Sequence, residues 1–254
     1  MRFGNNAVFR RMSNDEYLST NEQASMKGVT LKTIILLLSS ILTAVLCMVL
    51  VQPLDTVSGG IIIFGYLITP IITLILSFVI SFNPLAAKIL SIPYCILQGI
   101  SIGTLTGLLT AFLGVEGGLM VGLAFVITLT FFLAATILYS TNIVKVGRKF
   151  RNFLFVSLSG IILTSFVVFI VSLFVPAVGS LFYGNTSIAL LYSIFCVIIA
   201  GLYSFVTLDN AYKLVSMGLA KDVEWYAAFG IVVNVIWLFY EVLRLVMILS
   251  SRNR

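Results

Sequence analysis

Long apolar stretches separated by short polar segments organise this chain. A hydrocarbon core about 30 Å thick takes around 20 helical residues to cross. Seven apolar stretches of that size lie at about 31–52, 59–81, 86–113, 117–140, 152–175, 187–212 and 225–249. They lack the alternating pattern of barrel strands, and a lipid-facing backbone must satisfy its own hydrogen bonds. The pattern therefore predicts an all-α polytopic membrane protein, a bundle of seven transmembrane helices.

The polar ends of the chain set the expected domain organisation. Residues 1–30 are predicted to form a cytoplasmic N-terminal tail, 31–249 the seven-helix transmembrane domain and 250–254 a C-terminal tail. The first apolar stretch has no small-residue cleavage site, so we interpret it as a true span and not as a removable signal peptide. The loops are short, so one bundle accounts for nearly the whole chain.

Composition agrees with a bilayer as the main partner. Apolar residues make up 60% of the 254 positions, 9% are charged, and mean hydropathy is +1.16. Roughly a quarter of the residues in a soluble domain are charged. The net charge of +6 does not indicate nucleic-acid binding, because the basic residues follow the loops of a membrane protein.

Lys and Arg occur in alternate loops, which predicts the orientation. The first, third and fifth loops contain neither residue type, whereas the tail and the other loops carry Arg2, Arg10, Arg11, Lys27, Lys32, Lys88, Lys145, Arg148, Lys149, Arg151, Lys213 and Lys221. The N-terminus is therefore expected in the cytoplasm. Arg252 and Arg254 fall on the far side if the last segment crosses, which leaves a re-entrant last segment open.

One residue type on which many enzymes depend, histidine, is missing. The chain has no His, which removes His-based triads, His-ligated zinc and the usual proton switch near neutral pH. Cys47, Cys95 and Cys196 stand singly in separate apolar stretches, which favours packing over a disulfide or a metal site. We expect no catalytic residues, no cofactor and no enzyme activity.

Glycines recur every four residues in the third stretch, at Gly99, Gly103 and Gly107. On a helix they form one smooth stripe that lets another backbone approach closely. We expect this stripe to pack inside the bundle, and a homodimer face is the alternative.

Two acidic residues, Asp209 and Glu241, lie within or at the edge of apolar stretches. A carboxylate inside a bilayer is costly, so it usually faces a protein interior or a wet cavity. Each also has a simple structural interpretation, because Asp209 can pair with Lys213 and Glu241 with Arg244 on the same helix. Both interpretations stay open at this point.

Helix geometry separates these two positions. If the seventh span starts near Trp225 at the inner face, Asn234 lies about 13 Å deep and Glu241 about 24 Å deep. Asp209 and Glu241 therefore cannot share a proton. Asn234 is the better-placed partner for Asp209, because its amide can donate a hydrogen bond to a carboxylate.

Three segments together resemble signatures of the Bax inhibitor-1 family, in its bacterial branch. They are LYSTNIVKVGRKF at 138–150, EWYAAFG at 224–230 and WLFYEVLRL at 237–245. The resemblance implies a seven-helix bundle with a central last helix in a bacterial plasma membrane. It also implies a pH-sensitive calcium leak closed by an aspartate pair.

One aspartate of that pair maps onto Asp209, but its partner maps onto Asn234, so the pair is incomplete here. Relatives also resemble one another in having an Arg in the second span, and this chain has no charge between 59 and 81. Asp209 with the Asn234 amide, carbonyls and water is still expected to form a weak, transient calcium site. Glu241 and Arg244 are expected to mark the outer end of the ion path.

Other classes of function remain open. Some bacterial relatives associate with a membrane-bound protease, so the resemblance also implies a regulatory protein that binds such a partner without transport. An ion-coupled transporter would be favoured by inverted repeats, which the hydropathy does not show. A membrane enzyme is disfavoured by the missing chemistry.

Overall fold

The computed structural model describes residues 22–51, 60 and 63–252. In this part of the chain seven helices are long and apolar enough to cross a membrane, which confirms the predicted all-helical fold. The helices that form these spans are α2 (Met26–Val51), η2 (Phe64–Ile68) with α4 (Thr69–Phe82), η3 (Pro84–Ala86) with α5 (Ala87–Leu113), α6 (Val115–Ser140), α7 (Arg148–Phe174), α9 (Ser187–Ser216) and α10 (Val223–Arg252).

The spans end within a few residues of the predicted positions, with two differences that matter for function. Helix α7 begins at Arg148 and not at 152, so Arg151 lies inside the helix and not in the preceding loop. The last segment is one continuous helix, α10, which is long and apolar enough to cross a membrane and ends at Arg252 and not at 249. The predicted first loop and most of the predicted tail lie outside the described residues.

The described chain forms two compact units. The first comprises the chain up to Gly118 together with Asn210–Val232, and the second comprises Leu119–Asp209 and Val233–Arg254. Helices α9 and α10 each contribute to both units. They are also the two most buried of the seven spans, α10 more than α9. Polar side chains can therefore lie on these two helices without facing lipid.

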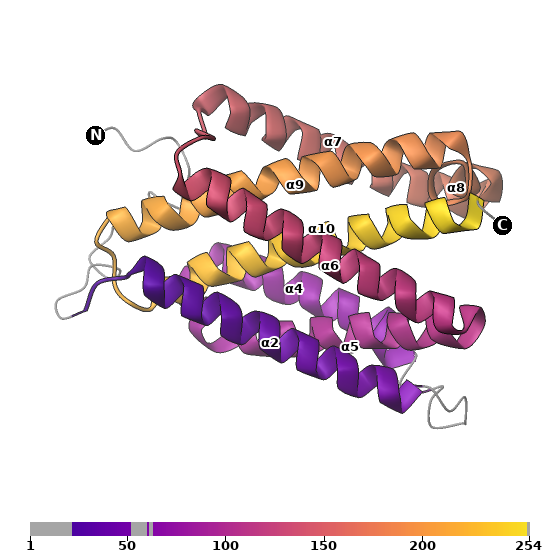
Figure 1. Ribbon diagram of the computed structural model, residues 1–254, viewed down its shortest axis with the longest axis horizontal. Helices are drawn as coiled ribbons and strands as arrows, with labels where there is room; N and C mark the ends of the chain where they lie inside the picture. Colours follow the sequence, from indigo (N-terminus) through magenta and orange to yellow (C-terminus); the bar gives the residue numbers. More distant parts are fainter. Residues whose placement is uncertain (1–21, 52–59, 61–62, 253–254) are drawn as a thin grey trace. The chain divides into compact units, whose positions relative to one another are not determined.

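In the first unit α2 packs along α5 (Figure 1). The glycine stripe makes this contact: a Cβ added at Gly99 would lie 2.4 Å from the Ser40 carbonyl oxygen, and one at Gly103 would lie 2.3 Å from that of Ala44. The two backbones approach more closely than any side chain at these positions permits. The expected packing of the stripe within the protein is confirmed for Gly99 and Gly103.

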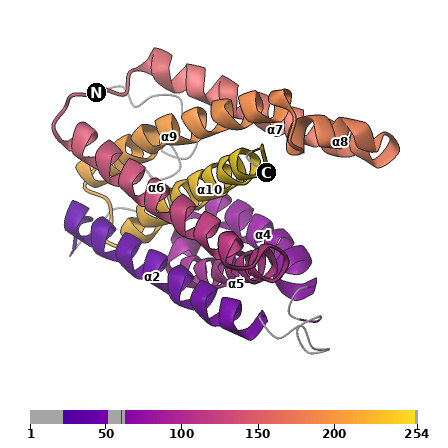
Figure 2. The same ribbon diagram turned by 45° about the vertical axis from the view of Figure 1, so that its right-hand side comes forward.

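In the second unit α7 packs against α9 around a core of buried apolar side chains. Its fully or nearly buried members are Leu154, Ile161, Cys196, Ile199 and Val206. Cys196 therefore serves packing, as predicted, and all three cysteines are free and buried. A short helix, α8 (Pro176–Tyr183), follows α7 directly and occupies the predicted fifth loop (Figure 2).

Candidate functional site

Asp209 is buried near one end of the second unit, where its carboxylate is held by two side chains from other helices. The Arg151 guanidinium on α7 forms an ion pair with Oδ2, and the Tyr139 hydroxyl on α6 donates to Oδ1 at 3.1 Å. Asp209 lies seven residues before the end of α9, about 10 Å along the axis. The end of α6, the start of α7 and the last turns of α9 therefore meet around one carboxylate.

Sequence reasoning missed Arg151 as a site residue because it counted this residue as a loop cation. The structural interpretation of Asp209 considered Lys213 on the same helix, and the structure adds a cation from another helix, 58 positions away. One signal in the sequence did point to Arg151. The fourth and sixth loops are both basic, so the alternation rule already placed Arg151 and the end of α9 on the same side of the membrane.

Asn234 on α10 is buried and makes its hydrogen bonds to another part of α9. Its amide nitrogen donates to Ser204 Oγ at 3.0 Å and to the Ala200 carbonyl at 3.4 Å. Ser204 precedes Asp209 by five residues, about 7.5 Å along the helix. The expected donation from Asn234 to Asp209 is therefore replaced by donation to these two groups. The Asn234 Oδ1 atom is buried and has no hydrogen-bond partner among the described residues.

Glu241 and Arg244 form the ion pair expected for residues three apart on one helix, at 2.8 Å between Oε2 and Nη2. Trp237 Nε1 donates to Glu241 Oε1 at 3.2 Å. The Arg244 guanidinium lies over the ring of Tyr192, 5.1 Å from its centroid, where the negative face of the ring attracts a cation. This cluster of largely buried side chains lies in the C-terminal half of α10.

The two acidic positions are far apart, as predicted. Arg244 Nε lies 3.5 Å from Ser193 Oγ, near the start of α9. Ser193 and Asp209 are sixteen residues apart on that helix, about 24 Å along its axis. Ser251 at the end of α10 donates to Asn185 at 2.6 Å, just before α9 begins. The end of α10 therefore lies at the opposite end of the second unit from Asp209.

The oxygen atoms around Asp209 bear on cation binding. Ca²⁺ prefers six to eight oxygen ligands, and Asp209 offers a carboxylate beside one tyrosine hydroxyl. Throughout the described residues, no three His, Cys, Asp or Glu side chains gather as a metal site. The Arg151 guanidinium pairs with this carboxylate, so a cation that binds Asp209 has to compete with it.

Seven apolar helices that bury a few ionisable side chains define a polytopic helical membrane protein. A scan against protein families matches residues 6–251 to the family described as Bax inhibitor 1 like. The chain therefore belongs to the Bax inhibitor 1 like family, whose members are generally non-enzymatic membrane proteins. A search of curated proteins gives no significant match.

Proposed function

We propose that this protein is a cation leak channel of the Bax inhibitor-1 type, with calcium as the main ion and Asp209 as the gating residue. The observation that carries the proposal is the buried Asp209 carboxylate, held by an arginine from another helix. Membership of the family supports the same function. The described arrangement is then the closed one, because the Arg151 guanidinium occupies the carboxylate that an ion would need.

Opening requires the Asp209–Arg151 pair to separate. Asp209 then regains a net negative charge beside the Tyr139 hydroxyl, and this pair of oxygen ligands with water gives a weak site that an ion can leave. Protonation of Asp209 removes that charge and also breaks the ion pair. With no His in the chain, this carboxylate is the group that makes passage depend on pH.

The unpaired Oδ1 of Asn234 supplies a second oxygen ligand for an ion along the proposed path. A buried carbonyl oxygen without a partner is costly, so a water or a passing cation stabilises it. Asn234 is neutral, and it stabilises an ion less than a second carboxylate would. Glu241 and Arg244 mark the outer end in this scheme, because their cluster lies at the start of α9.

The proposed location is a bacterial plasma membrane with the N-terminus in the cytoplasm. In the first unit the segment before α2, the start of α5 and the α9–α10 turn meet at one end, where Lys32, Lys88 and Lys221 gather. In the second unit Arg151 and the end of α9 also share one end. Both arrangements agree with basic residues on the cytoplasmic side.

Calcium entry into liposomes that contain a calcium indicator tests the proposal. Asp209→Asn should lower entry about tenfold, because one charge-assisted contact to the ion is lost. It should also flatten the dependence on pH. Arg151→Gln should raise entry, because the competing guanidinium is gone. Lys149→Gln is the matched control: it removes the same charge from an exposed side chain two residues away and should change nothing.

Asn234→Asp restores the second carboxylate expected from the family and should enlarge the change in calcium entry with pH, because two carboxylates along the path then change charge in place of one. If the wild-type protein passes no more calcium than empty liposomes, and Asp209→Asn behaves identically, the leak channel is refuted. The regulatory protein that binds a membrane protease or another integral partner then takes its place.

A further inference from the structure

A second buried carboxylate, Glu224, lies in the first turn of α10 and has no part in the proposed ion path. Its side chain is 2% exposed. A buried charge requires partners that replace water. In the first unit those partners come from the segment that leads into α2 and from α2 itself.

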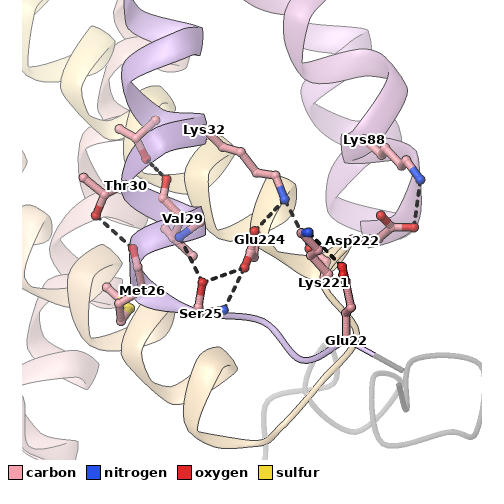
Figure 3. A network of polar contacts seen from close by, with 12 residues as sticks. Glu22, Ser25, Met26, Val29, Thr30, Lys32, Lys88, Lys221, Asp222 and Glu224 are labelled. Atoms are coloured by element: carbon pink, nitrogen blue, oxygen red, sulfur yellow. Dashed lines mark hydrogen bonds and ion pairs between the residues drawn. The ribbon is translucent and has the colours of Figure 1, made fainter. Parts of the chain in front are cut away.

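Three donors hold the Glu224 carboxylate (Figure 3). The Ser25 backbone N–H donates to Oε1 at 2.7 Å, and the Ser25 hydroxyl lies 3.1 Å from the same atom. The Lys32 ammonium donates to Oε2 at 2.6 Å and also reaches the Lys221 carbonyl at 3.3 Å. Both carboxylate oxygens are therefore occupied, and the ion pair is almost completely removed from solvent.

The sequence at the start of α2 leaves room for this carboxylate. A Cβ added at Gly28 would lie 2.0 Å from Glu224 Oε2, so only glycine fits there without moving the acid. The Ser25 hydroxyl accepts the Gly28 N–H at 3.0 Å and so acts as the N-cap of α2. The short motif from Ser25 to Gly28 thus caps α2 and also binds the Glu224 carboxylate at the start of α10.

Backbone contacts join the same two segments. Gln23 and Ala220 form an isolated antiparallel bridge. The Ala24 N–H donates to the Leu219 carbonyl at 2.8 Å, and the Lys221 N–H donates to the Glu22 carbonyl at 3.1 Å. We call these two segments, residues 22–25 and 219–224, the clasp.

An exposed ion pair lies at the edge of the clasp, where Lys221 Nζ and Glu22 Oε2 are 2.7 Å apart. The hydrogen bond from the Lys221 ammonium to the Glu22 carboxylate raises the pKa of Lys221 above the usual lysine value. Both side chains are solvated, so this pair adds little to the clasp. The buried Glu224 is the main polar contact.

We propose that Glu224 is a positioning residue, which fixes α10 along its axis through the clasp and so restrains the ion path. The inference rests on the proposed leak function and adds its regulation. Helix α10 is continuous, and Asn234 follows Glu224 by ten residues, about 15 Å. A shift at the start of this helix therefore carries Asn234 with it. The segment before α2, which holds Glu224, therefore acts on the proposed ion path through the continuous helix α10.

The variant Glu224→Gln keeps the shape of the side chain and removes its charge. It should raise calcium entry about tenfold, the effect of one charge-assisted contact on an opening equilibrium. The matched control is Asp222→Asn, two residues away. Asp222 makes an exposed pair with Lys88 at 3.0 Å, so its loss should leave entry unchanged. Should Glu224→Gln not fold, Lys32→Met removes the same ion pair from the other side.

A reversible cross-link separates positioning from a purely structural role. Paired antiparallel residues have Cα atoms about 4.5–5.5 Å apart, within the range of a disulfide. In the Glu224→Gln protein, Gln23→Cys with Ala220→Cys should close the clasp on oxidation and return calcium entry to the wild-type rate. Reduction should raise it again. The three native cysteines, Cys47, Cys95 and Cys196, are first replaced by alanine.

Hydrogen exchange supplies a readout that does not depend on transport. Release of the clasp should speed amide exchange at residues 22–28 and also around Asn234. Faster exchange confined to residues 22–28, or calcium entry that the closed cross-link does not lower, overturns the inference. If wild-type protein passes no calcium, the leak function fails by itself. Exchange around Asn234 then still decides whether Glu224 positions α10.

Discussion

The close contact between α5 and α2 makes a sharp prediction about Gly103. Replacing it with alanine places a Cβ 2.3 Å from the Ala44 carbonyl oxygen and 2.8 Å from Cys47 Cβ. Ordinary contact starts at 3.4 Å, so the helices must separate locally by 3.4 − 2.3 = 1.1 Å. Because the nearest obstacle is backbone, no side-chain rotation can relieve the overlap.

The energetic cost follows from that displacement. Overpacking in a close-packed interior costs about 1–3 kcal/mol, and a backbone obstacle places Gly103→Ala near the upper value. About 3 kcal/mol corresponds to a folded-to-unfolded ratio lower by about a hundredfold. The matched control is Gly160→Ala, in the middle of α7, where an added Cβ meets nothing within 4 Å. There alanine should be neutral or stabilise by up to about 1 kcal/mol, because it is the better helix former.

Unfolding of both variants in detergent, followed by the loss of helical signal, measures this difference. Gly103→Leu should also lower the yield of folded protein while the surviving protein keeps its oligomer size. A Gly103→Ala protein as stable as the Gly160→Ala control would refute the packing argument. A clean change from dimer to monomer at normal yield would assign the stripe to a homodimer instead.

Two further predictions concern orientation and the Glu241–Arg244 ion pair. A cysteine at Ser180 should react with an impermeant reagent in intact cells and one at Asn152 should not, because basic loops stay in the cytoplasm; reversed labelling would invert the topology. Arg244→Gln should lower stability by about 3–5 kcal/mol in the same detergent assay, because it leaves the largely buried Glu241 unpaired. The double variant with Glu241→Gln should recover part of this loss, and no recovery would mean that the pair itself is unimportant.

The sequence by itself determined the class of protein and most of its helices. A bilayer imposes a fixed length and an apolar surface on each span, so composition along the chain is enough to locate seven of them. Local spacing also predicted the close-packing role of Gly99 and Gly103 and gave the Glu241–Arg244 pair as one of two interpretations, because both depend on positions three or four apart on one helix.

Only the tertiary structure decided which side chains meet from different helices. Asp209 pairs with Arg151, Asn234 donates to Ser204, and Glu224 binds Lys32 across 192 positions. Hydrophobic periodicity says which face of a helix is buried but not which neighbour covers it. The partner of a buried charge is set by helix packing, since a carboxylate that has lost water must take the nearest donors that the packed helices present. The candidate site around Asp209 and the clasp around Glu224 both consist of such contacts between side chains of different helices.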